Sequence, residues 1–345
     1  MRFNAGRRLA QLPNSWRIFI FSVFWLILIS LLHYGLNSPK ETRKIIKMGY
    51  MPVISNLAAP ILDHVTRKGD KVRFEAVKFS SFAEMAEAVR NNHIQAAFMI
   101  APLSIVLRQQ GEDVKVVYIG NRHESTLVVA KNHSAEKFED LAGMTVAVPM
   151  RYSGHYLTMM KMMEKLDMKG QINIVEMNPP DMASAMVSGA LDAYFVGEPF
   201  AAKSLKSGHS KVLYHVEDIW PDFICNLMVV KGTFIEQDPE TVRLLVHSAI
   251  RSGIWAGHNA SQAAEIAANY WNQPADLVEY ALNHPPDRIQ YMHYTPDAGQ
   301  LQEMAALMVR FGLLKNDNLD GLVDARFAGD VDVKGVTDID SIFRP

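Results

Sequence analysis

The sequence predicts an α/β protein with two similar lobes, each a mostly parallel sheet flanked by helices. Three observations support this fold class. Short apolar strands alternate with helices of about ten residues through most of the chain, which is typical of parallel sheets built from βαβ units. A strand–turn–helix pattern occurs twice at one constant offset. Several helical segments without intervening strands follow, so they must pack on lobes that are already complete.

The stretch Thr145–Met168 shows the repeated pattern most clearly. Thr145–Val148 is rich in β-branched residues and suits a buried strand. After a polar turn, apolar residues recur at helical spacing from Tyr156 onward. In both copies a proline follows the strand and precedes the helix, Pro52 in the first copy and Pro149 in the second.

A second pair of segments aligns at the same offset. Ala86–Pro102 and Ala183–Pro199 share a helix–turn–strand pattern, and each ends in proline. Two proline pairs at one offset, within matching patterns, indicate two homologous lobes. A protein of this kind usually binds a ligand between its lobes.

In the first lobe, apolar runs predict strands and amphipathic segments predict helices. The strands are Ile45–Met51, Val72–Phe79, Ile94–Ile100 and Val114–Ile119, and the helices are Leu57–Arg67, opened by Ser55 and Asn56, and Ala83–Asn91. Glu84 and Glu87 favour the N-terminal half of the second helix, because acidic side chains stabilise the positive end of a helix dipole.

In the second lobe the same reasoning predicts a crossing strand at Thr126–Lys131, and Asp181 is expected to cap a helix. The other strands are Thr145–Val148, Ile172–Glu176 and Ala190–Val196, and the helices begin at Tyr156 or span Met182–Ser188 and Ala201–Lys206. Phe223–Val230 is expected to return the chain to the first lobe. Four helices follow, at Pro239–Trp255, Ala260–Tyr270, Ala275–Leu282 and Ala298–Phe311, and residues 315–345 form an acidic, turn-rich tail.

The N-terminal residues have the pattern of an export segment. Four arginines precede Ile18–Leu32, which contains no charged residue. A basic leader followed by an apolar run is typical of a signal that keeps its positive end in the cytoplasm. Residues 1–36 are therefore predicted to be a signal peptide or a membrane anchor, since residues 16–36 are long enough to span a bilayer. A buried core helix is the third alternative, and residues 37–44 read as a polar linker.

Composition excludes several classes of protein. The chain has 345 residues, of which 49% are hydrophobic and 21% charged, and these values describe a globular protein. Its net charge of −2 gives no basic surface for nucleic acid. Cys225 is the only cysteine, so an internal disulfide and a multi-cysteine metal site are excluded.

The polar turns suggest ligand binding and not catalysis. Arg151, Tyr152, Ser153 and His155 crowd the first turn of a helix, where unpaired backbone N–H groups attract an anion. Glu198, at the end of a strand, suggests instead a cationic or amine ligand, an ion pair across the lobes or a fixed turn, and these alternatives stay open. The methionine-rich helix is expected to fill a core and not to bind copper. No catalytic motif stands out, and neither a metal nor a cofactor is expected.

Three motifs carry a resemblance to a known family. They are GYMPVISNLAAPIL, LAGMTVAVPMRYSGHY and SGALDAYFVGEPFAAK. Over Lys44 to Leu314 the chain resembles the type II periplasmic substrate-binding proteins of ABC importers, in the nitrate, sulfonate, taurine and thiamine-precursor group. The resemblance implies a two-lobed type II fold with extra C-terminal helices. It places lobe 1 at residues 45–125 plus 231–314 and lobe 2 at 126–230, with crossovers near 121–131 and 223–230.

The resemblance also implies a site at the carboxyl ends of the strands. The implied ligand-binding residues are Val53, Ser55, Asn56, Ser80, Ser81, Phe82, Ala101, Ser125, Arg151, Tyr152, Ser153, Gly154, His155, Glu198 and Asn226. The expected function is an extracytoplasmic receptor that delivers a small anion, sulfonate-like or nitrate-like, to an ABC permease and ATPase. A ring-bearing precursor such as a pyrimidine, an anchored sensor domain and a pyrimidine-synthase-like enzyme are the alternatives. The chain lacks a clear lipobox cysteine or cleavage site, which leaves the mode of anchoring open.

Overall fold

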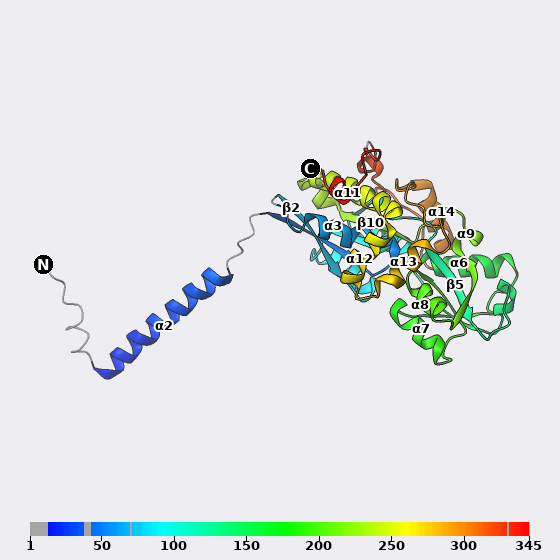
Figure 1. Ribbon diagram of the computed structural model, residues 1–345, viewed down its shortest axis with the longest axis horizontal. Coiled ribbons are helices and arrows are strands. Elements are labelled where there is room, and N and C mark those ends of the chain that lie inside the picture. Colours follow the sequence, from blue (N-terminus) through cyan, green and yellow to red (C-terminus); the bar gives the residue numbers. More distant parts are fainter. Residues whose placement is uncertain (1–12, 38–42, 70, 330, 345) are drawn as a thin grey trace. The chain divides into compact units, whose positions relative to one another are not determined.

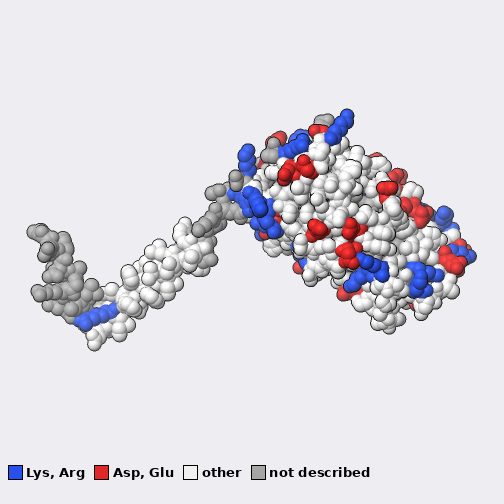
Figure 2. Space-filling model, viewed as in Figure 1, with Lys and Arg blue, Asp and Glu red and all other residues white. Residues whose placement is uncertain are grey.

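The computed structural model describes residues 13–37, 43–69, 71–329 and 331–344. The chain divides into two compact units, residues 1–43 and residues 44–345. The first unit contains α2 (Asn14–Asn37), whose only charged residue is Arg17. In Figure 2 the visible side of α2 is almost uncharged, whereas basic and acidic side chains are interspersed over the visible face of the second unit.

The segment Asn14–Leu36 is long and apolar enough to cross a membrane, by length and composition alone. None of its 18-residue apolar window is buried inside the protein. A signal peptide and a membrane anchor are both compatible with this segment. The basic leader before residue 13 and most of the predicted linker lie outside the described residues.

The second unit contains two five-stranded sheets (Figure 1). The first has the order β2-β1-β3-β10-β4 and the second the order β7-β6-β8-β5-β9. Their strands are β1 (Lys44–Tyr50), β2 (Val72–Lys78), β3 (Ala96–Ile100), β4 (Val114–Ile119), β5 (Ser125–Ala130), β6 (Thr145–Val148), β7 (Asn173–Glu176), β8 (Ala193–Gly197), β9 (Ser210–His215) and β10 (Asn226–Lys231). In each sheet one strand, β10 or β5, runs antiparallel to both of its neighbours. The predicted class, two lobes that each contain a sheet flanked by helices, is confirmed, and each sheet is mixed, with two parallel and two antiparallel strand pairs.

The two sheets confirm the internal repeat. β1 pairs in parallel with β2 and β3, and β6 pairs in the same way with β7 and β8. Ala96 begins β3 and Ala193 begins β8, two residues that align in the repeat. The antiparallel strand of each sheet follows a crossing between the lobes, since β5 comes directly after β4 of sheet 1 and β10 enters sheet 1 after the last strand of sheet 2.

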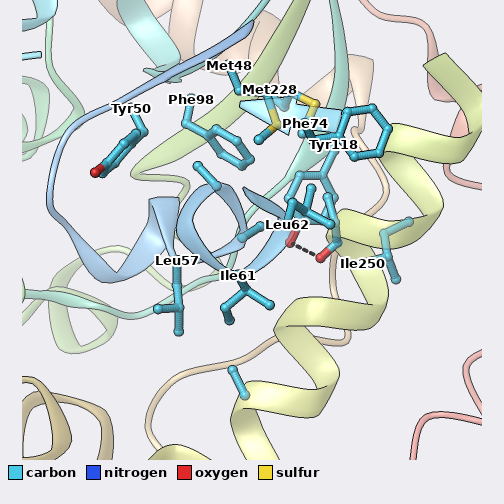
Figure 3. Close-up of a cluster of buried hydrophobic side chains, with 14 of the residues drawn as sticks. Met48, Tyr50, Leu57, Ile61, Leu62, Phe74, Phe98, Tyr118, Met228 and Ile250 are labelled. Carbon is cyan, nitrogen blue, oxygen red and sulfur yellow. Dashed lines mark hydrogen bonds between the residues drawn. The ribbon is translucent and has the colours of Figure 1, made fainter. Parts of the chain in front are cut away.

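Helices cover both faces of each sheet. The helices are α3 (Ala58–Thr66), α4 (Phe82–Arg90), α5 (Ala101–Gln109), α6 (Gly154–Lys165), α7 (Pro179–Val187), α8 (Phe200–Lys206), α9 (Val216–Ile219), α10 (Gly232–Gln237), α11 (Pro239–His258), α12 (Ala260–Trp271), α13 (Ala275–Asn283) and α14 (Ala298–Arg310). One core of the first lobe packs α3, α11 and α12 on sheet 1. In it Phe98 and Tyr118 meet edge to face, with ring centroids 6.4 Å apart (Figure 3).

Several local predictions need correction. The sequence reasoning missed the helices α5 and α10 and the strand β9, an edge strand whose polar residues hide the apolar alternation. The helix expected at Met182 begins at Pro179, with Asn178 at its N-cap, so Asp181 lies within the first turn and is not the cap. Proline favours the first helical position because its ring already holds the helical φ angle.

The C-terminal residues belong to the first lobe. Short 3-10 turns at Ala325–Phe327 and Ile339–Ser341 hold Phe327 and Ile342 against its core. Val323 forms a parallel bridge with Val116 of β4, and the Val116 N–H donates to the Leu322 carbonyl at 2.7 Å. The tail therefore covers the free edge of sheet 1, where an exposed strand would invite pairing with another chain.

Candidate functional site

The turn after β1 reaches into the second lobe. Val53 lies in a core cluster whose other buried members, Phe200 and Tyr194 among them, come from lobe 2. The Ile54 N–H donates to the Glu198 carbonyl at 2.8 Å. A Cβ on Gly120 would lie 2.0 Å from the Ser55 carbonyl oxygen, so this turn packs directly on the segment that leaves β4. The two lobes are thus in close contact around the turn.

The two segments that cross between the lobes run side by side. Arg122 and Ile224 form an antiparallel bridge. At the start of β10, Asn226 donates from Nδ2 to Asn56 Oδ1 at 2.7 Å, and Asn56 donates in turn to the Met51 carbonyl at 3.0 Å. Both asparagines are buried, so this chain of amide bonds fixes the β1 turn against the returning strand.

A histidine and a serine meet on the lobe 2 side. His155 Nε2 lies 2.9 Å from Ser125 Oγ, and both residues are buried. The imidazole packs edge-on against Phe195 and Phe223, with centroid distances of 5.0 and 5.6 Å. Burial lowers the pKa of His155 to about 3, so the ring is neutral at physiological pH. Its Nδ1 has no hydrogen-bond partner among the described residues.

Glu198 holds the end of β8 through its side chain. Oε1 accepts from Thr126 Oγ1 at 2.8 Å, and Oε2 accepts from the Ala202 N–H at 2.7 Å. Burial raises the pKa of Glu198 to about 7, and the nearby Arg288 guanidinium opposes this shift. Both oxygens are bonded within the protein, and Arg288 lies 4.0 Å from Oε1, so two of the three roles left open for Glu198 are present in the structure: it fixes the turn into α8 and it forms an ion pair with a residue that follows α13.

Glu124 was missed by the sequence reasoning, and it lies at the centre of this junction. It is fully buried, and its Oε2 accepts from the Glu198 N–H at 2.8 Å. Burial raises its pKa, while hydrogen bonding by Cys225 and Ser55 and the charge of Arg288 act in the opposite direction. Neither Glu124 Oε1 nor Ser55 Oγ has a partner of good hydrogen-bond geometry in the described part of the chain.

Arg288 was also missed. It follows α13, far along the chain, yet its side chain is buried in the junction between the lobes. Its Nε donates to Glu217 Oε1 at 2.8 Å and one terminal nitrogen donates to Thr126 Oγ1 at 3.0 Å. The same terminal nitrogen lies 4.0 Å from Glu198 Oε1.

The sequence held a partial signal for these two residues. Glu124 belongs to the polar run Asn121–Ser125, between two apolar strands at the predicted crossing, where a charged residue must enter the junction. Arg288 stands in a loop between helices and has no motif around it, so only the folded chain brings it to Glu217.

The residues named from the sequence fall into two groups. A buried group surrounds the junction of the lobes, namely Val53, Ser55, Asn56, Ala101, Ser125, Ser153, Gly154, His155, Glu198 and Asn226. Ser153 caps α6 by accepting from the Tyr156 N–H at 3.1 Å, and a Cβ on Gly154 would lie 2.6 Å from the Phe223 ring. Ser153 therefore caps the start of α6, and Gly154 packs it closely against Phe223.

The second group lies toward the surface except for Phe82, which is buried. Arg151 has a 58% exposed side chain and donates from Nε to Glu176 Oε1 at 2.8 Å, so it is not brought to the buried junction. Ser80 is exposed, and Tyr152 packs at the margin of a lobe 1 core. Ser81 and Phe82 line a cavity of about 290 Å³ whose other wall comes from lobe 2, at Pro149, Met150 and Glu176–Pro179.

Within the described residues no group of three or more His, Cys, Asp or Glu side chains could hold a metal ion. The methionines of α6 pack in the core of lobe 2, as Met159 and Met163 do. The described residues of the junction therefore provide hydrogen-bonding oxygen and nitrogen atoms for a ligand, but no metal centre.

Two repeated lobes, crossed by paired segments and meeting at a buried polar junction, define the class of bilobed periplasmic-binding folds. Residues 39–270 match the NMT1-like family, and the chain belongs to that family. The resemblance that the motifs suggested is therefore confirmed at the level of the family.

Two curated proteins illustrate the relationship. The chain is 30% identical over 178 residues to the taurine-binding periplasmic protein of Escherichia coli and 22% identical over 195 residues to the nitrate import ATP-binding protein NrtC of Synechocystis. These alignments cover 50% and 51% of this chain. The chain spans 54% and 29% of the lengths of these two relatives.

Solved structures show the same fold. The ligand-binding component of an ABC-type import system from Staphylococcus aureus, with zinc bound, superposes with a TM-score of 0.76 at 23% identity, covering 84% of this chain and all of that one. The nitrate-binding protein NrtA of Synechocystis gives a TM-score of 0.72 at 13% identity, with 86% and 91% coverage. The sulphonate-binding protein SsuA of Escherichia coli gives 0.66 at 18% identity, with 80% and 95% coverage. These three solved structures are described as ligand-binding, nitrate-binding and sulphonate-binding proteins.

Proposed function

We propose that this protein is an extracytoplasmic receptor that binds a small sulfonate-like or nitrate-like solute and delivers it to an ABC importer. The observation that carries the proposal is the buried polar junction between two lobes of a chain in the NMT1-like family. The partial alignment with a taurine-binding periplasmic protein supports a sulfonate over other solutes.

The ligand site is proposed at Ser55 and His155, which face the junction from opposite lobes. The Ser55 hydroxyl is buried and can donate one hydrogen bond. When Ser125 donates to His155 Nε2, the proton of the neutral imidazole is on Nδ1, which then serves as a second donor. His155 Nδ1 has no partner among the described residues, and the Ser55 hydroxyl makes no hydrogen bond of good geometry there, so these two donors suit the oxygen atoms of a sulfonate or nitrate.

Closure of the lobes provides the signal that a transporter can recognise. Val53 and the Ile54 N–H bind lobe 2 in this structure, so the β1 turn belongs to the contacts that form when the lobes approach. Bilobed receptors commonly close around a ligand by hinge motion. A permease and an ATPase are the proposed partners of the closed form.

The proposed location is the extracytoplasmic side of the inner membrane. A periplasmic relative and the apolar helix α2 support this location. Residues 16–36 serve either as the anchor or as part of a signal. Mass determination of the mature protein from membranes distinguishes the two, because a cleaved chain lacks α2.

Calorimetry on the purified full-length chain tests the proposed function. Titration with taurine, ethanesulfonate and nitrate is expected to give saturable binding for at least one of them. Ser55→Ala is expected to weaken that binding about 5- to 10-fold, because a neutral hydrogen bond contributes about 1 kcal/mol. The absence of binding by all three solutes to a folded protein would refute the receptor assignment for this ligand class.

A further inference from the structure

The loop between α13 and α14, residues 284–297, runs beside the two segments that cross between the lobes. Arg122 forms an antiparallel bridge with Gln290 as well as with Ile224. The Arg122 N–H donates to the Gln290 carbonyl at 3.0 Å, and the Gln290 N–H donates to the Arg122 carbonyl at 3.2 Å. Three segments therefore lie side by side at the crossing. Two of them connect the sheets covalently, and the α13–α14 loop is the third.

The α13–α14 loop is fixed to the first lobe. Ile289 packs against the core in which α3, α11 and α12 lie on sheet 1. The Tyr291 ring lies on α11, because a Cβ on Gly253 or Gly257 would be 3.0 or 3.2 Å from it. The chain immediately after Arg288 therefore belongs to lobe 1.

The Arg288 side chain extends from this loop into lobe 2. Its Nε donates to Glu217 Oε1 of α9 at 2.8 Å, and one terminal nitrogen donates to Glu217 Oε2 at 3.3 Å. The other terminal nitrogen donates to Thr126 Oγ1 of β5 at 3.0 Å, and the Ser125 carbonyl also accepts from the guanidinium. Arg288 is buried, so solvent and salt screen these contacts little.

A second contact between the same parts of the chain lies at the start of α13. Lys206, at the end of α8 in lobe 2, donates to the Asp276 carbonyl at 3.1 Å and pairs with the Asp276 carboxylate. Both side chains are exposed, and exposed ion pairs contribute little to stability. Arg288 is therefore the stronger of the two connections.

We propose that the α13–α14 loop acts as a clasp between the lobes, and that Arg288 is its closing contact. Because the loop is anchored on lobe 1, movement of α9 and β5 away from that lobe requires the guanidinium to leave Glu217, Thr126 and Ser125. The clasp shifts the receptor toward the closed arrangement and makes the opening that admits or releases a solute rarer. This inference does not depend on the chemistry of the solute.

Hydrogen–deuterium exchange on the full-length chain, without added solute, tests the clasp. The Ile54 N–H donates to the Glu198 carbonyl across the lobes, so its exchange reports their separation. The amides of β6 and β8 report the opening of the lobe 2 sheet itself. Arg288→Gln is expected to speed exchange at Ile54 about 10- to 100-fold, the range for hydrogen bonds to a charged group, and to leave β6 and β8 unchanged.

Two outcomes would overturn the proposal. Unchanged exchange at Ile54 in Arg288→Gln would show that the guanidinium does not hold the lobes together. Equal acceleration at Ile54 and in β6 and β8 would show that Arg288 stabilises the whole fold and has no particular effect on lobe separation.

Glu217→Gln tests the same contact from the lobe 2 side. It removes one charge and leaves the buried guanidinium in place, so a smaller rise of about 5-fold is expected at Ile54. Arg326→Gln is the matched control, because the exposed ion pair of Arg326 with Asp324 lies in the C-terminal tail, and it should keep the wild-type rate. If Arg288→Gln does not fold, Glu217→Gln decides alone, and a wild-type rate at Ile54 in that variant would contradict the clasp.

Discussion

The turn after β1 and the turn after β6 have the same place in the two lobes but different partners. In lobe 1 the residues from Pro52 to Asn56 are all buried, and Val53 packs among lobe 2 side chains. In lobe 2 the matching turn exposes Arg151, which pairs with Glu176 of its own sheet. The same strand–turn–helix unit therefore contacts the opposite lobe in lobe 1, whereas in lobe 2 it pairs with its own sheet.

This difference shows why equivalent sequence positions need not share a function. A helix start offers backbone N–H groups in either lobe. In lobe 2, however, the Ser153 hydroxyl is used to cap α6, and Gly154 is packed against Phe223. At the junction, three buried polar atoms without a well-formed hydrogen bond in the described part of the chain belong to Ser55 in the lobe 1 turn, Glu124 in a crossing segment and His155, the second residue of α6.

The largest expected effect is a loss of stability when a side-chain atom is added at Gly120, where the lobe 1 turn packs on the segment after β4. Gly120→Ala places a Cβ 2.0 Å from the Ser55 carbonyl, and a backbone atom cannot easily move away, so we expect a loss of about 3 kcal/mol of stability. In Gly154→Ala the close contact, at 2.6 Å, is with the Phe223 side chain and not with backbone, so a smaller loss of about 1 kcal/mol is expected.

Urea unfolding of the full-length chain measures both losses. Gly329→Ala is the matched control, because its Cβ would meet only ordinary contacts. Equal losses for Gly120→Ala and Gly154→Ala would show that the two turns are equally constrained and would remove the contrast between the lobes.

The second largest effect is expected on the pH dependence of stability, to which two junction residues, Glu198 and His155, contribute in opposite directions. The pKa of Glu198 is raised to about 7, so its contribution to stability is complete below its ordinary pKa and is lost as the pH rises through 7. The pKa of His155 is lowered to about 3, so its contribution is complete above its ordinary pKa and is lost as the pH falls. Between pH 8 and pH 5 the two changes oppose each other.

Glu198→Gln separates these two responses. Between pH 8 and pH 5 the variant still loses the stability that depends on neutral His155, but it cannot gain stability from protonation of Glu198. Over this pH range its free energy of unfolding should therefore fall by about 2 kcal/mol relative to that of the wild type. Urea unfolding at pH 8, 6.5 and 5 measures the difference, with Glu265→Gln as a control for loss of a carboxylate. Parallel curves for Glu198→Gln and the wild type would show that Glu198 does not titrate in this range.

The smallest effect is expected at the lobe 2 turn. Arg151→Ala removes an exposed ion pair with Glu176, so we expect no measurable change in the melting temperature or in the affinity for taurine. Calorimetry at low and high salt checks the affinity. A weaker affinity that high salt reproduces in the wild type would restore Arg151 as a counter-charge for the ligand and would make the two turns alike.

Much of the fold could be predicted because the signals are local. Alternating apolar strands and amphipathic helices predicted nearly every strand, and the spacing of Pro52 and Pro149 predicted the repeat that the two sheets show. The missed strand, β9, lies at a sheet edge, where polar residues are tolerated. The site was less predictable, because the burial of Glu124 and the distant approach of Arg288 depend on contacts between segments far apart in the sequence.

The sequence by itself determined the class of fold, the two-lobed repeat, the apolar N-terminal segment and the family, since each depends on composition or on patterns within a short stretch of chain. The tertiary structure decided which polar residues meet. It left Arg151 in solvent and brought Glu124, Glu198 and Arg288 together, because the return of β10 and the loop after α13 bring distant segments to one junction.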